Sequence, residues 1–154
     1  MQMGSSPVIA TDVSKLVDLA RNRTAEGRSA LVSAIGDLIE DDRQFSAQEM
    51  ALMNDILKKL INDVARPIRK ALAAKLAHTR SAPAEVIEIL ANDEIDVSAA
   101  ILQHSELLTD RALIDIIGKR TREHRLAIAM RKHISNGVSD ALVAPKEPDV
   151  IKRL

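Results

Sequence analysis

Apolar positions recur in the second half of this chain in three copies, which begin at residues 68, 97 and 126 and are therefore 29 residues apart. In each copy the apolar side chains are spaced by three and four residues, as on one face of a helix. The aligned sets are Ile68, Val97 and Leu126, then Ala71, Ala100 and Ala129, then Leu72, Ile101 and Met130. A repeat of 20–50 residues predicts helical hairpins that stack on one another.

A second apolar set follows each copy and predicts a partner helix. Val86, Ile87 and Leu90 form the first such set, and Leu113, Ile114 and Ile117 form the next. Asp63 is the expected cap of the first repeat helix, with Pro67 in its first turn, and Gly118 is expected just beyond the end of a helix. We expect six helices near residues 63–78, 81–92, 96–104, 109–117, 121–132 and 135–143.

The N-terminal residues are also helical in pattern but do not share this period. A short helix is expected after Asp12, and a longer one after Thr24. Ser46 and Glu49 have the spacing of a capping box. We assign residues 1–11 to a disordered N-terminus, 12–62 to an N-terminal helical cap, 63–143 to three helical-hairpin repeats, and 144–154 to a linker that leads to a missing C-terminal region.

Composition supports an all-α fold. The chain has 154 residues, of which 46% are apolar, with a single aromatic residue, Phe45, and five glycines. Such a core is built from aliphatic side chains in closely packed helices. The repeated alanines would let neighbouring helices approach closely. The predicted fold is a right-handed α-α superhelix of HEAT-like helical hairpins with an N-terminal helical cap.

Two resemblances support this prediction. Asp63, Val64, Ile68, Arg69, Ala71 and Leu72 resemble the D-x-x-V-R-x-A-A-x-x-L pattern of HEAT repeats. Residues 16–143 are similar to a bacterial family known as domain of unknown function 2336, most specifically in the stretches 90–95, 105–109 and 124–129 (LANDEI, SELLT and HRLAIA). The resemblance implies a helical superhelix in a bacterial cytoplasmic protein, and it implies no particular activity.

Several classes of function lose support from the composition. The chain has no cysteine, so disulfides and thiolate metal sites are excluded. No apolar run is long enough for a membrane span, and Met1 to Ala10 do not read as a signal peptide. The glycines are too dispersed for a phosphate-binding loop. We expect a cytoplasmic protein that is not an enzyme and that needs no metal or cofactor.

Charge is balanced overall, with 22 basic and 22 acidic residues, but one basic cluster interrupted only by Glu123 marks the third repeat. It consists of Lys119, Arg120, Arg122, Arg125, Arg131 and Lys132. A protein-interaction scaffold is the leading hypothesis, with a protein partner, or the rest of its own chain, as the ligand. An acidic partner would meet the basic repeat favourably. The expected contacts are Arg122, Arg125, Arg131 and Lys132.

Nucleic-acid binding and phosphotransfer are the two alternative functions. A HEAT-like module could use the basic third repeat to bind nucleic acid through its phosphates, although no aromatic residue lies near for base stacking. A phosphotransfer-type signalling domain would use His78 or His124 as the phosphoacceptor. For His104 and His133, a structural role near helix C-termini is the favoured interpretation. The acidic clusters around Asp41 and Asp93 are read as helix ends, with Asp93 or Asp96 as an N-cap.

Overall fold

The computed structural model describes residues 24–41 and 44–144. This part of the chain contains eight α-helices and one short 3-10 helix, and no strand, which confirms the all-α class. The elements are α2 (Ala25–Glu40), α3 (Ala47–Leu60), η1 (Ile61–Asp63), α4 (Arg66–Leu76), α5 (Ala84–Ala91), α6 (Ile95–His104), α7 (Asp110–Lys119), α8 (Arg122–Ala129) and α9 (Asn136–Val143). The helix expected after Asp12, the N-terminal segment 1–11 and residues 145–154 of the expected linker lie outside the described residues.

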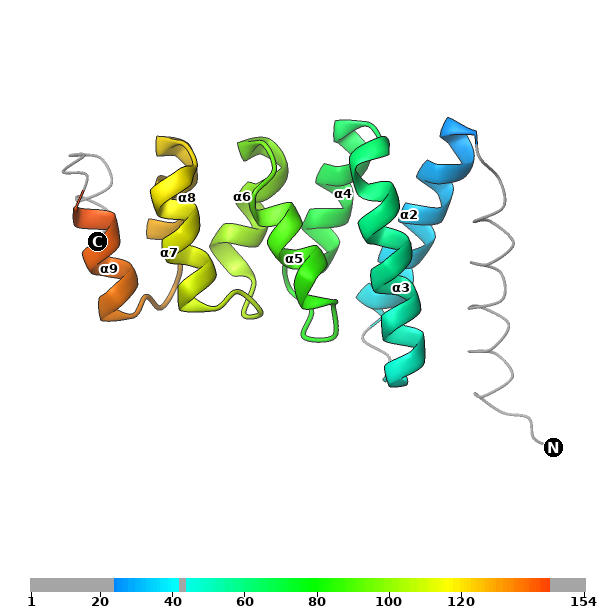
Figure 1. Ribbon diagram of the computed structural model, residues 1–154, viewed down its shortest axis with the longest axis horizontal. Helices are drawn as coiled ribbons and strands as arrows, with labels where there is room; N and C mark the ends of the chain where they lie inside the picture. The colour runs from blue at the N-terminus through cyan, green and yellow to red at the C-terminus, as the bar shows by residue number, and fades with distance from the viewer. Residues whose placement is uncertain (1–23, 42–43, 145–154) are drawn as a thin grey trace.

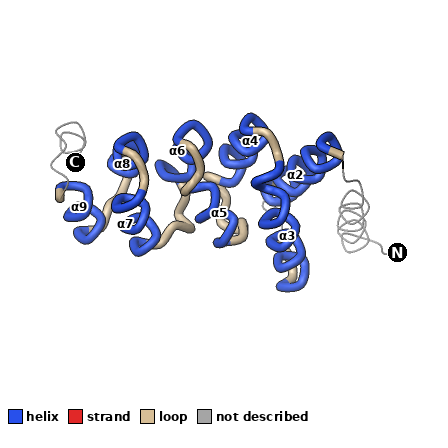
Figure 2. The backbone as a smooth tube through the Cα atoms, turned by 45° about the horizontal axis from the view of Figure 1, so that its top comes forward, coloured by secondary structure: helices blue, strands red, loops and turns tan. Residues whose placement is uncertain are grey.

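The helices form two rows along an elongated molecule (Figure 1). In the first row α2 packs on α4, α4 on α6, and α6 on α8. In the second row α3 packs on α5, and α7 on α9. Figure 2 shows the first row along the upper edge and the second along the lower edge. Successive hairpins therefore stack side by side, and α2 meets α4 in the same way as α4 meets α6.

Short polar side chains begin most helices at the predicted residues. Thr24, Thr109, Thr121 and Ser135 are N-caps whose hydroxyls accept from backbone N–H groups three residues later. Ser46 and Glu49 form the complete capping box, with both reciprocal hydrogen bonds. Such caps satisfy backbone donors that the first helical turn leaves without partners. Pro67 lies in the first turn of α4, as predicted.

Four local predictions are wrong. Asp63 does not cap α4, because the chain forms η1 and then buries an extended Val64, so α4 begins after Ala65. Neither Asp93 nor Asp96 caps α6, whose N-cap is Glu94. Gly118 lies inside α7, which continues to Lys119. The helix expected to reach Lys132 ends at Ala129, because Arg131 turns toward the end of α6.

The aliphatic core lies between the two rows and contains Leu31, Ile35, Leu57, Leu76, Ile87, Leu90 and Ile101, all nearly inaccessible to solvent. The three repeat copies are not equivalent in burial. Leu72 and Ile101 are buried, whereas Met130 is 51% exposed because α8 has already ended. Among the repeated alanines, Ala71 is exposed, Ala100 is partly buried and Ala129 is buried.

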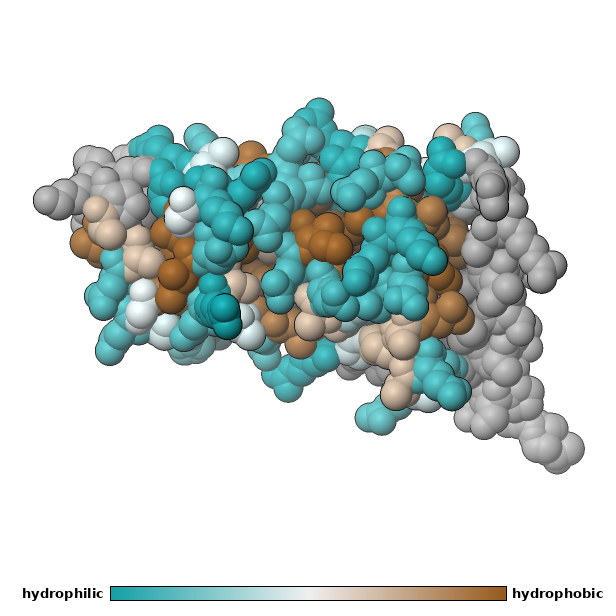
Figure 3. Space-filling view, in the orientation of Figure 1, coloured by the Kyte–Doolittle hydropathy of each residue, from teal (hydrophilic) through white to brown (hydrophobic). Residues whose placement is uncertain are grey.

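At Gly36, α2 and α4 approach closely. A Cβ atom at this position would lie 2.9 Å from Cδ1 of Leu72 and 3.4 Å from Cδ of Lys75. Glycine, the smallest residue, therefore occupies the position where α2 packs against α4. On the visible face polar residues cover most of the surface, with apolar residues showing between the helices (Figure 3).

Candidate partner-binding site

The four predicted contact residues do not lie on one face. Arg122 and Arg125 belong to the first turn of α8, whereas Arg131 and Lys132 follow its end. An eight-residue helix is about 12 Å long, so α8 separates the cluster into two pairs. Arg122 and Lys132 are exposed, and Arg125 and Arg131 are partly buried. Lys119 pairs with Asp115 at 2.9 Å on its own helix.

Arg131 is bound to the end of a neighbouring helix. Its Nη1 donates to the carbonyl oxygen of Leu102 at 2.7 Å, and its Nη2 donates to that of Ser105 at 2.7 Å. The last carbonyls of a helix have no partner within the helix, so the planar guanidinium closes the C-terminal end of α6. Burial lowers the pKa of the Arg131 guanidinium, while Asp110 and Glu106 act in the opposite direction. Arg131 joins the second and third repeats.

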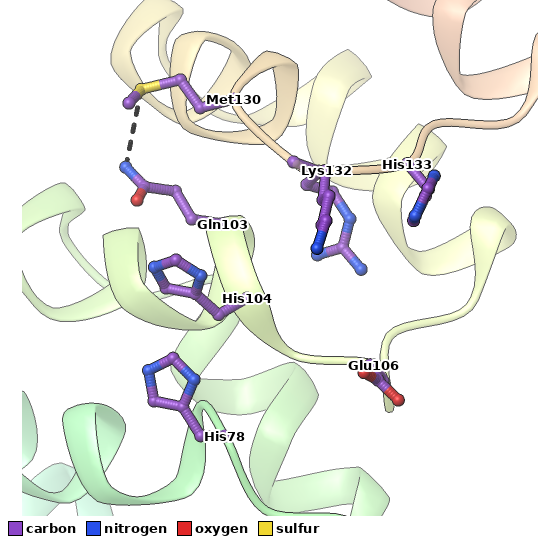
Figure 4. A pocket seen from close by; sticks show the side chains of 8 residues that line it. His78, Gln103, His104, Glu106, Met130, Lys132 and His133 are labelled. Carbon is purple, nitrogen blue, oxygen red and sulfur yellow. Dashed lines mark hydrogen bonds between the residues drawn. The ribbon is translucent and has the colours of Figure 1, made fainter.

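A hollow of about 530 Å³ lies beside this contact, where the C-terminal ends of α4, α6 and α8 meet. Figure 4 shows the side chains that line it. They are His78, Gln103, His104, Glu106, Met130, Arg131, Lys132 and His133. Half of the predicted contact residues and three of the four histidines thus come together here, because successive first-row helices end at the same edge.

Two of these histidines form a pair. The ring centroids of His78 and His104 are 4.8 Å apart, and the ring planes are tilted by 36°. Across the hollow, Lys132 and His133 extend from the loop after α8 (Figure 4). The 29-residue period aligned His104 with Lys75, but Lys75 binds Asp37 on α2, and His78 takes the place beside His104.

Few opposing charges face this hollow. Glu106 is the acidic residue among those that line it, and its Oε1 lies 3.2 Å from Nη2 of Arg80. Gln103 donates to the sulfur of Met130 at 3.6 Å, so one wall carries an amide and a thioether. The lining therefore combines cations, imidazoles and one apolar side chain, which suits a ligand with negative charge and some aliphatic surface.

His124 occupies a different environment. It is 1% exposed, with Nδ1 at 2.7 Å from Oγ1 of Thr121 and Nε2 at 2.8 Å from the carbonyl oxygen of Asp93. Because a carbonyl only accepts, Nε2 carries the proton. Both ring nitrogens are engaged inside the protein, so this histidine links α8 to the loop before α6.

The acidic segment before α6 has a related structural role. Arg69 on α4 donates to both carboxylate oxygens of Asp93, at 2.7 and 3.3 Å, and to the carbonyl oxygen of Val64 at 2.7 Å. This fork-shaped contact is partly buried, and bidentate pairs of this kind fix geometry. Together with His124, it places one polar junction at the start of three consecutive hairpins. The sequence placed Asp93 at a helix end and Arg69 in the HEAT-like pattern, but it did not predict that these two residues bind each other.

Within the described part of the chain, no group of three or more acidic or histidine side chains is arranged to hold a metal ion. Asp42, from the first acidic cluster, lies outside the described residues. Among the described helices, none is both long and apolar enough to cross a lipid bilayer.

Comparison with known proteins finds a family model that matches part of the chain. Residues 97–154 match the family described as uncharacterised protein conserved in bacteria (DUF2336), which confirms the predicted family for this part of the chain. The matched region begins in α6 and includes the basic third repeat and most of the residues that line the hollow. No curated protein and no solved structure matches the chain.

Proposed function

We propose that this protein is a non-enzymatic, cytoplasmic protein-interaction scaffold, built as a right-handed α-α superhelix of HEAT-like hairpins. The observation that carries the proposal is the hollow at the C-terminal ends of α4, α6 and α8, which is lined by side chains of α6 and of the segments that follow these three helices. A surface assembled from consecutive repeats is how stacked helical proteins bind extended partners.

The distribution of charge favours a protein partner over nucleic acid. Arg131 is bound to two backbone carbonyls and Lys119 to Asp115, and α8 divides the remaining cluster. A phosphate backbone is bound best by a continuous basic stripe, whereas a short acidic segment needs only a local patch. A phosphotransfer role for His124 lacks support, because neither ring nitrogen faces solvent.

Site-specific photo-crosslinking tests the scaffold proposal. A photoreactive amino acid replaces Met130, which is 51% exposed at the hollow, and in a control variant it replaces Lys70, an exposed residue in the first half of α4. In a native lysate of the source bacterium, we expect a discrete protein adduct from position 130 and none of that size from position 70. Equal adducts from both positions, or none from either, would contradict a partner surface at the hollow.

A further inference from the structure

The hollow between α4, α6 and α8 has two parts that differ in chemistry. On one side, the tilted rings of His78 and His104 lie 4.8 Å apart. On the other side, Lys132 and His133 extend from the loop after α8 (Figure 4). Arg131 also lines the hollow, with two of its donors already bound to carbonyls.

We propose that this hollow binds an acidic peptide segment, whose carboxylates contact the Lys132 ammonium group and the imidazoles of His78, His104 and His133. The inference rests on the proposed function and names the chemistry of the partner. Carboxylates accept hydrogen bonds from an ammonium group or an imidazole N–H, and such charge-assisted bonds are stronger than neutral ones.

The electrostatic balance of the lining supports this ligand class. Glu106, the acidic residue of the lining, is paired with Arg80 at 3.2 Å. Lys132 is exposed and makes no ion pair within the described residues. A ligand carboxylate therefore meets a basic surface whose single internal carboxylate already has a counterion.

The size of the hollow and the side chains that line it favour a peptide ligand over a nucleic-acid strand. About 530 Å³ is large enough for several side chains. Met130 contributes a flexible thioether that packs against aliphatic carbons of varied shape, and Gln103 contributes an amide group beside it. A nucleic-acid strand would instead need aromatic stacking or a long basic track, and no aromatic residue other than histidine lines the hollow.

Fluorescence anisotropy with a labelled hexaglutamate peptide tests the proposal on the full chain. We expect Lys132→Glu, and separately the double variant His78→Gln with His104→Gln, to weaken binding about fivefold or more, the size of one or two exposed charged contacts. Lys70→Glu, which changes an equally exposed lysine far from the hollow, should bind like the wild type.

Thermal melts of every variant separate lost binding from lost folding. Hexaglutamate affinities that are the same in wild type, Lys132→Glu and the double variant would overturn the proposal. Tighter binding of a DNA duplex, weakened by the same substitutions, would also overturn it and assign the hollow to nucleic acid.

The two proposals fail in different ways. If hexaglutamate does not bind but position 130 still yields a discrete adduct, the partner is not acidic and the scaffold function stands. If hexaglutamate binds with the expected variant pattern but no adduct forms, the site stands and the scaffold function in the cell does not.

Discussion

At the scale of single residues, three polar side chains join one hairpin to the next. His124 and Arg131 each bind a backbone carbonyl of the preceding repeat, and Arg69 binds the Asp93 carboxylate before the next one. In a core made of aliphatic side chains, non-directional packing alone leaves the register of stacked helices loosely fixed. These directed contacts specify how consecutive repeats meet.

His124 gives a direct test of this role. In His124→Leu the carbonyl of Asp93 loses its donor while remaining shielded by the stack, and we expect the free energy of unfolding to fall by about 1–3 kcal/mol. His133→Leu, an exposed histidine nine positions further on, should change it by less than about 0.5 kcal/mol. Urea denaturation measures both values. A His124 variant as stable as the His133 variant would remove the carbonyl contact from the stabilising interactions.

Glu85 provides a test by titration. The pKa of its carboxyl is lowered because Nζ of Lys58 donates to Oε2, Nδ2 of Asn54 donates to Oε1, and the ammonium charge adds to both. A lowered folded-state pKa means that this contact stabilises above the unfolded-state pKa and that the contribution is lost as the pH falls through the folded-state value. In Lys58→Met the pKa of Glu85 should rise toward its ordinary range. Carboxyl carbon shifts followed by NMR against pH measure this pKa, and an unchanged midpoint would show that Lys58 and Glu85 are not paired in solution.

At the scale of elements, the helix beginnings that carry a Ser or Thr cap are encoded locally, whereas the end of α8 is not. A Ser or Thr hydroxyl satisfies an N–H three residues away, so Thr24, Ser46, Thr109, Thr121 and Ser135 could be found from sequence. The end of α8 at Ala129 could not be found in this way, because Arg131 leaves the helix and reaches a carbonyl 29 positions away along the chain. No local pattern contains that contact.

Arg131 is therefore predicted to be a stabilising residue as well as part of the hollow. Arg131→Met leaves the carbonyls of Leu102 and Ser105 without their charged donor and should cost about 2 kcal/mol of unfolding free energy. Lys132→Met, its exposed neighbour, should have little effect on stability. Chemical denaturation distinguishes them, and equal midpoints would mean that solvent replaces the guanidinium at the end of α6.

The repeated alanines allow a second test at this scale, because they differ in how deeply they are buried. Ala100→Leu, at a partly buried position in α6, and Ala129→Leu, at a buried one in α8, should each overpack the stack and cost about 1–3 kcal/mol. Ala71→Leu should be nearly neutral, because Ala71 is exposed. Melting curves of the three variants measure how much stability each substitution removes. A loss at Ala71 as large as at Ala129 would contradict the observed register of α4.

At the scale of the whole molecule, the period predicted stacked hairpins, and the structure places them in two rows. The hollow could be anticipated only in part. The basic residues after α8 were identified from the sequence, and the period aligned His104 with His133. His78 was outside that alignment, and its place beside His104 depends on the turn that follows Leu76. Which residues contact each helix end depends on packing between elements, and the sequence pattern alone does not contain this information.

A stack of this kind should not unfold as one uniform unit. Each hairpin contacts only its neighbours, so stability is a sum of local and interface contributions. First-row helices α4 and α6 have neighbours on both sides, whereas α9 packs on α7 and α8 at one end of the described stack. We expect the slowest amide hydrogen exchange in α4 and α6 and faster exchange in α9.

Leu142→Ala separates local from global opening. It removes a fully buried side chain from α9 and should speed exchange in α9 and the facing part of α7, with little change in α4. Leu76→Ala, equally buried in the middle of the first row, should speed exchange in both neighbouring hairpins. Each truncation costs about 2–5 kcal/mol of local stability. The two variants should therefore differ in which helices exchange faster and not in how much stability is lost. If both variants accelerate every helix to the same extent, the repeats are fully coupled and the hollow at the ends of α4, α6 and α8 opens only when the whole chain unfolds.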